Sequence, residues 1–162
     1  MNHRANDRRK TQEPGPRRHA REAALQVLFS LDSLHRLTGD GGELEPEQID
    51  RAINGYWAHL EGAPDGREYA DAIVRGVMKH LTEVDTAIRE ANPNWRLDRM
   101  GRVDRNVLRI ATYEMVFGGE VPAEVAIDEA VDLARRFGTA ESASFVNGTL
   151  DKVARLKGRL RK

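Results

Sequence analysis

The chain has 162 residues, enough for one domain with its own hydrophobic core, and it contains no cysteine. Disulfides and thiolate metal sites are therefore excluded, and a cytoplasmic location is the natural expectation. Hydrophobic residues make up 40% and charged residues 32% of the sequence, which is typical of a helix-rich globular protein. No apolar run is long enough to cross a membrane, and the basic N-terminus lacks the apolar segment of a signal peptide.

The formal net charge of zero conceals a segregation of charge along the chain. Residues 1–21 carry a balance of +5, residues 151–162 again carry +5, and the stretch between them carries −10. This pattern indicates a polyanion bound by the ends and a basic protein bound by the body, or else two solvated tails. We expect residues 1–15 to form a flexible basic arm, residues 16–158 a single domain and residues 159–162 a basic tail.

Apolar residues recur every three or four positions through most of the chain, which predicts helices. The 65–91 segment is either one helix or two, because Thr82 and Asp85 have the spacing of a capping box. No segment alternates with a period of two, so no strand is expected and the fold class is an all-α bundle of about six to seven helices. The expected helices cover residues 16–37, 46–61, 65–91, 104–117, 122–137 and 139–156, with one helical turn within 95–103.

Residue types that carry catalysis or bind metals form no recognisable site in this sequence. The five histidines show neither an HExxH pattern nor another paired metal spacing, and no G-x-S-x-G nucleophile elbow is present. The Gly-rich loop at 38–46 is not a phosphate cradle, because no strand precedes it and no Gly-Lys-Ser/Thr follows. We therefore expect no catalytic residues, no cofactor and no metal.

The first expected helix carries an aromatic ring away from its apolar face. At about 100° per residue, Phe29 lies about 140° from the centre of the apolar stripe and within about 20° of Arg18 and Glu22. Phe29 and Arg18 thus share an outer strip of a helix that begins with Arg17, Arg18 and Arg21. Arginines beside an exposed ring favour single-stranded nucleic acid, because guanidinium groups meet phosphates and a ring stacks on a base. The alternative is that Phe29 packs beneath a neighbouring helix.

Three weaker features lie in the last two helices. Phe145 lies about 120° from the centre of the core stripe of its helix. Its ring either packs at the edge of the core or is a second stacking platform. Glu124, Asp128 and Asp132 form an acidic ridge, which is either a solvated face or a docking surface for a basic protein. The solvated face is favoured, because exposed charges contribute little. Gly148 costs about 1 kcal/mol inside a helix, which indicates a close contact with another helix.

Four blocks of the sequence, in this order and spacing, resemble the NusB family of bacterial transcription antitermination proteins. They are RRHAREAALQVLFSLD from residue 17, VDRNVLRIATYEM at 103–115, VPAEVAIDEAVDLARRFG at 121–138 and SFVNGTLDKVA at 144–154. The match runs from residue 17 to about residue 156, and four blocks in register are far more specific than any one of them. The departures are the long N-terminal arm and the loop at 38–46, and neither touches the blocks.

This resemblance implies an all-helical fold of two small subdomains and a function without catalysis. It implies binding of single-stranded boxA RNA from ribosomal RNA leaders together with NusE, a small-subunit ribosomal protein. With other Nus factors, such a complex acts on RNA polymerase and prevents early termination. We expect Arg109 and Glu114 to have structural roles, in pairing or capping between helices. The resemblance places RNA contacts at Arg17, Arg18, Arg21, Phe29, Glu141, Ser142 and Phe145.

Two other functions are weighed against this one. A NusB-like domain also precedes the catalytic domain of an rRNA cytosine methyltransferase, so an accessory domain for an RNA-modifying enzyme is the second hypothesis. Against it, the sequence shows no strand and Gly-rich pattern for a methyl donor. A purely protein-binding helical adaptor is the third. The sequence leaves open whether the chain is a monomer or a homodimer.

Overall fold

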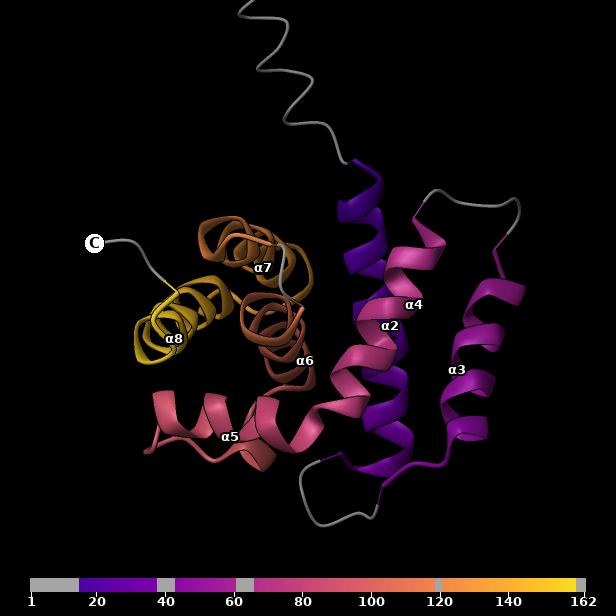
Figure 1. The fold of residues 1–162 in the computed structure, drawn as a ribbon, viewed down its shortest axis with the longest axis horizontal. Coiled ribbons are helices and arrows are strands. Elements are labelled where there is room, and N and C mark those ends of the chain that lie inside the picture. Colours follow the sequence, from indigo (N-terminus) through magenta and orange to yellow (C-terminus); the bar gives the residue numbers. More distant parts are fainter. Residues whose placement is uncertain (1–14, 38–42, 61–65, 119–120, 160–162) are drawn as a thin grey trace, which may run out of the picture.

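The structure, a computed structural model, describes residues 15–37, 43–60, 66–118 and 121–159, and all regular structure within these ranges is helical. This confirms the all-α prediction (Figure 1). Most of the expected N-terminal arm and C-terminal tail lies outside the described residues. The elements are α2 (Pro16–His35), α3 (Pro46–Ala58), α4 (Arg67–Lys79), α5 (Leu81–Ala91), the 3-10 turn η1 (Leu97–Arg99), α6 (Arg102–Thr112), the π-helical turn η2 (Tyr113–Phe117), α7 (Ala123–Phe137) and α8 (Ser142–Leu156).

The helices form two groups that meet where α2 packs against α6. α3 and α4 lie with α2 on one side of Figure 1, and α5 to α8 lie together on the other side. The apolar faces of all these helices join one buried cluster, in which Leu28, Ile73, Leu108 and Leu150 are almost completely shielded from solvent. This arrangement agrees with the two small subdomains that the resemblance implied. No helix in the described part of the chain combines the length and apolar character needed to cross a membrane.

The helix boundaries follow local backbone chemistry. Pro16 occupies the first turn of α2, where its fixed φ suits a helix and its missing N–H is not needed. Arg36 ends that helix in the left-handed conformation, with φ 48°, and its N–H donates to the Asp32 carbonyl. Of the two alternatives for the expected 65–91 helix, the described residues form two helices, α4 and α5, which meet at His80. The expected capping box at Thr82 is wrong, because α5 begins at Leu81 without a side-chain cap.

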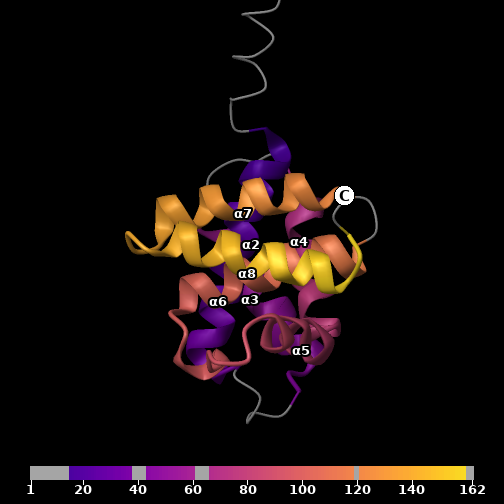
Figure 2. The same ribbon diagram turned by 90° about the vertical axis from the view of Figure 1, so that its left-hand side faces the viewer.

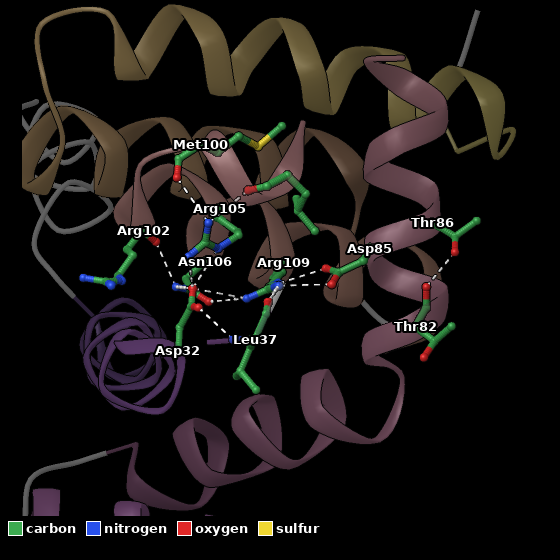
Figure 3. Close-up of polar contacts among 11 residues, drawn as sticks. Asp32, Leu37, Thr82, Asp85, Thr86, Met100, Arg102, Arg105, Asn106 and Arg109 are labelled. Atoms are coloured by element: carbon green, nitrogen blue, oxygen red, sulfur yellow. Dashed lines mark hydrogen bonds and ion pairs between the residues drawn. The ribbon is translucent and has the colours of Figure 1, made fainter. Parts of the chain in front are cut away.

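Arg109 stands at the centre of a buried polar network where the two groups of helices meet (Figure 3). Its Nε and Nη2 donate to the two carboxylate oxygens of Asp85 at 2.8 and 3.0 Å, and Nη2 also donates to the Leu37 carbonyl. The side chains of Arg109 and Asp85 are both buried. The network thus joins α6 to α5 and to the end of α2, and the expected structural role of Arg109 is confirmed.

Asp32 extends this network from α2. Its Oδ2 accepts hydrogen bonds from Arg105 Nε at 2.8 Å and from Asn106 Nδ2 at 2.9 Å, and its Oδ1 accepts one from the Leu37 N–H. Arg105 also donates to the carbonyls of residues 97 and 100, in the segment that leads into α6. The network therefore fixes relative to α2 the segment that leads to Gly101 and Arg102.

Candidate nucleic-acid interface

Phe29 lies in the second half of α2, with 39% of its surface exposed. The ring is therefore not sealed beneath a neighbouring helix. It lines a depression of about 370 Å³ between α2, the start of α6 and the connection from α7 to α8. The other residues that line this depression are Gly101, Arg102, Val103, Asp104, Phe137, Gly138, Thr139 and Ser142.

Phe137 brings a second aromatic ring to the same depression. It is the last residue of α7, it is 40% exposed, and the Arg136 guanidinium lies over its ring with Cζ 5.0 Å from the centroid. In the sequence, Phe137 is only the last residue of the expected 122–137 helix. The available signal was an aromatic residue directly before the helix-ending Gly138, although nothing in the sequence placed it beside Phe29.

Gly138 shapes the wall of the depression. It follows Phe137, where both the expected helix and α7 end, and its N–H donates to the Ala134 carbonyl at 2.9 Å. Its φ of −96° suits any residue, but a Cβ there would lie 2.4 Å from Ser142 Oγ and 2.7 Å from the Ala134 carbonyl oxygen. Ser142 Oγ accepts the Thr139 N–H at 2.9 Å, so α8 begins at Ser142 and not at Thr139. Ser142 is consequently buried inside this turn.

The expectation that Arg18 and Phe29 share one open outer strip of α2 is wrong, because α7 contacts the helix at Arg18. Arg18 Nε donates to Glu129 Oε2 at 3.0 Å, and Glu22 pairs with Arg136, so two ion pairs fasten this strip to α7. The hydrogen bond that Arg18 donates to Glu129 raises the pKa of the Arg18 guanidinium above its ordinary value. About 16 Å of helix separates Arg18 from Phe29. The exposed arginine that shares the depression with Phe29 is Arg102 of α6.

Arg17 and Arg21 lie in contrasting environments, although both begin α2. Arg17 is exposed, with Cζ 5.0 Å from the centroid of the Tyr69 ring. Arg21 is 4% exposed, and its Nε and Nη2 donate to Glu114 at 2.7 and 2.9 Å. Burial opposes the charged form of Arg21, but the hydrogen bond and charge of Glu114 outweigh it, so the pKa of Arg21 is raised. Arg21 thus joins α2 to η2, and the structural role of Glu114 is confirmed.

Tyr69 makes the stability of its contact with Arg21 and Glu114 dependent on pH. Its hydroxyl donates to Glu114 Oε2 at 2.6 Å, and burial, followed by that hydrogen bond, raises the pKa of the phenol from 10.0 to about 12. The stability contributed by neutral Tyr69 is therefore complete below pH 10 and is lost as the pH rises toward 12.

We expect the free energy of unfolding of Tyr69→Phe to fall less steeply between pH 10 and pH 12 than that of the wild type, measured by urea titration at several pH values. Parallel curves for the two proteins would contradict this expectation.

The α8 residues implied by the resemblance differ in exposure. Glu141 is exposed at the N-cap of α8, whereas Phe145 is half-buried. The Phe145 ring meets the Trp95 ring edge to face, with centroids 5.4 Å apart. Trp95 is the more exposed of the two, although it is not among the site residues expected from the sequence. Its position after the helix-breaking Asn-Pro-Asn at 92–94 was the available signal.

Two further expectations concern α7 and α8. Gly148 is exposed, and a Cβ built on it meets nothing within 4 Å, so the expected close helix contact is wrong. On α7, Glu124 and Asp128 are exposed, and Asp132 pairs with Arg136 at 3.3 Å. This exposure agrees with a solvated acidic face.

The NusB family matches residues 18–155, which span α2 to α8. The chain belongs to the NusB family. The transcription antitermination protein NusB of Sorangium cellulosum is 48% identical over 146 residues, covering 90% of this chain and 96% of its own length. The NusB of Geobacter sulfurreducens is 43% identical over 140 residues, covering 86% of this chain and 94% of its own length.

Solved structures of NusB share the same arrangement of helices. NusB of T. maritima is 36% identical and superposes with a TM-score of 0.70, covering 87% of this chain and 92% of its own. A crystal structure of the antitermination factors NusB and NusE in complex with double-stranded RNA contains a chain that is 25% identical, with a TM-score of 0.68 and coverage of 87% and 97%. The NusB fold therefore accounts for the helices that carry Phe29 and Phe137 and for the connection from α5 to η1 that carries Trp95.

Proposed function

We propose that this chain is a transcription antitermination factor that binds boxA RNA of ribosomal RNA leaders together with NusE. The observation that carries the RNA part is the depression in which Phe29 and Phe137 are both half-exposed beside Arg102. Stacking rings and guanidinium groups are the usual means of holding an unpaired strand. The family relatives support the role in antitermination, and the NusB–NusE complex with RNA supports both partners. In this role the chain is cytoplasmic, joins other Nus factors on RNA polymerase and performs no catalysis.

The proposed contacts follow from exposure. Phe29 and Phe137 stack on bases, and the exposed guanidinium groups of Arg17 and Arg102 bind phosphates. Glu141 lies beside Ser142 at the start of α8, where its exposed carboxylate accepts hydrogen bonds from base amino groups. These side chains come from α2, α6, α7 and the start of α8, so binding of RNA here depends on how the two groups of helices pack together.

Two of the residues named from the resemblance, Arg21 and Ser142, are buried and support this surface from within. Arg21 holds α2 against η2 through Glu114, and Ser142 shapes the connection from α7 to α8. Arg18 is engaged with Glu129, so it contacts a phosphate only when that ion pair opens. We therefore assign direct contacts to exposed side chains and positioning to Arg21 and Ser142.

Duplex RNA is a second candidate ligand, because one structural neighbour was solved with double-stranded RNA. The rings of Phe29 and Phe137 favour an unpaired strand, since side chains cannot read the deep, narrow major groove of an RNA duplex. A duplex on this surface would be held through its backbone, by arginine and phosphate contacts alone. The aromatic rings are thus expected to contribute to the affinity for an unpaired strand but not to the affinity for a duplex.

A gel-shift titration with four RNAs tests the proposal: single-stranded boxA, a scrambled strand, boxA duplex and scrambled duplex, each with and without NusE. We expect single-stranded boxA to be retained most tightly and NusE to strengthen its retention. Equal retention of the scrambled strand would overturn the boxA assignment, and preference for a duplex would overturn the single-strand assignment. Binding of NusE without retention of any RNA would instead support the protein-binding adaptor.

Arg17 and Arg21 provide a matched pair for a test of the phosphate contacts, because they lie one helical turn apart and only Arg17 is exposed. Arg17→Gln is expected to reduce the slope of log affinity against log salt by about 0.7, the contribution of one phosphate contact on a single strand. Arg21→Gln is expected to leave the slope unchanged and to lower the thermal stability. Fluorescence-anisotropy titrations over a range of salt concentrations measure both slopes. The reverse result would move the phosphate contact to Arg21.

A further inference from the structure

A second aromatic feature lies close to the depression at Phe29. Trp95, between α5 and η1, is 58% exposed, and its ring packs edge to face on Phe145. This packing fixes the orientation of the indole while leaving much of it open to solvent. Trp95 lines a groove of about 550 Å³, together with Arg89, Glu90, Asn92, Pro93, Arg96, Leu97 and Asp98.

The groove and the depression adjoin along two segments of the chain. Residues 97–98 line the groove, and residues 101–102, which follow after two intervening residues, line the depression. On α8, Ser142 lines the depression, and Phe145, one turn later, contacts Trp95. In Figure 2, the connection from α7 to α8 and the segment that leads into α6 lie at the same end of the molecule. An extended ligand in the depression therefore has a short path to the groove.

Exposed arginines mark this path. Arg96, Arg99 and Arg102 recur every third residue from the groove to the depression, and all three are exposed. Asp98 is the exposed carboxylate between them, and it pairs with Arg96 at 2.8 Å. The segment thus carries an excess of positive charge, which complements a chain of phosphates.

The far side of the groove has the same sign of charge. Glu90 is paired with Lys157 at 3.6 Å, so its charge is compensated. Lys152 Nζ lies 3.4 Å from Asn92 Oδ1, and exposed Arg89 lines the groove. An exposed indole among cationic side chains has the composition of a stacking platform for single-stranded nucleic acid.

We propose that Trp95 is a second base-stacking residue, and that a single RNA strand runs from the depression at Phe29 along Arg102, Arg99 and Arg96 to the indole. The guanidinium groups bind the phosphates between the two stacked bases. This inference rests on the proposed RNA-binding function and extends the RNA path beyond the residues implied by the family resemblance. Because only an RNA long enough to span both sites can reach Trp95, the affinity is expected to depend on the length of the RNA.

The test compares Trp95→Ala with Trp95→Phe on a long single-stranded boxA RNA and on the same RNA shortened from each end in turn. Trp95→Ala is expected to weaken binding of the long RNA by about 5- to 150-fold, the range for loss of one stacked base. Trp95→Phe retains most of the affinity because it keeps an aromatic face. The matched control is Leu156→Ala, which removes another exposed apolar side chain, 61% exposed, and leaves binding unchanged. An RNA too short to reach Trp95 binds Trp95→Ala and the wild type equally.

Intrinsic fluorescence provides an independent readout. Trp57 is buried and donates its indole N–H to Asp71, so RNA-dependent quenching is expected to come from Trp95 and to disappear in Trp95→Phe. If Phe29→Ala loses affinity but Trp95→Ala binds every RNA like the wild type, this inference is overturned and the proposed function stands. If the wild type itself does not prefer boxA over a scrambled strand, the proposed function fails. Loss of NusE binding by Trp95→Ala, with unchanged affinity for RNA alone, would make the groove a protein site and overturn the inference.

Discussion

Arg109→Met is expected to lower the free energy of unfolding by about 3–5 kcal/mol, the usual cost of removing one partner from a buried ion pair. The Arg109 side chain is completely buried and forms two hydrogen bonds with Asp85. Methionine fills part of the space, but it leaves the Asp85 carboxylate in the interior without a counter-charge. Arg109 is the ion-pair partner of Asp85 in the part of the chain that the structure describes, so no second cation there compensates for the loss.

Urea titration followed by circular dichroism measures this effect. Asp85→Ala combined with Arg109→Met is expected to recover part of the stability, because exchange of a whole buried pair for apolar groups is often close to neutral. Arg155→Met is the matched control, because Arg155 pairs with Asp151 on the exposed face of α8, where such pairs contribute about 0.5 kcal/mol. A loss of less than about 1 kcal/mol for Arg109→Met would contradict the role assigned to the buried pair.

The helices were predictable because their signals are local. Apolar periodicity predicted the α-helices of the described residues, with ends that differ from the observed ones by a few residues. The errors at Thr82 and Arg18 arose where polar side chains have distant partners. The Asp85 carboxylate suggested a cap for its own helix, yet it pairs with Arg109 on α6. A sequence shows which groups can form a hydrogen bond but not which of several partners the fold brings within reach.

The candidate site was predictable only in part, for a related reason. The helical phase of Phe29 correctly placed the ring away from the core, and the structure leaves it half-exposed. The same phase placed Arg18 beside it, whereas α7 covers the helix at Arg18 and leaves it open at Phe29. A helical wheel assumes one environment along a whole helix, and α2 is long enough to have several. Phe137 and Arg102 reach the depression from other helices, so only tertiary structure reveals them.

Phe29→Ala is expected to weaken the binding of single-stranded boxA RNA by about 1–3 kcal/mol, which corresponds to the loss of one base–ring stack. Phe29 is 39% exposed, so the accompanying loss of stability is expected to stay below the roughly 3–5 kcal/mol typical of a buried phenylalanine. Fluorescence-anisotropy titration of labelled RNA measures the first quantity, and thermal unfolding measures the second. Duplex RNA is the internal control, since a ligand held only through its phosphates does not need the ring.

Two further variants at the same position separate stacking from packing. Phe29→Leu keeps an apolar side chain against the wall formed by Val103 but has no aromatic face, so we expect it to restore stability and not affinity. Phe29→Tyr keeps the ring and is expected to preserve both. If the leucine variant bound RNA as tightly as the wild type, stacking would contribute nothing and the ring would serve only to fill the depression. Because the three variants share one backbone position, differences among them report on the ring itself and not on the fold around it.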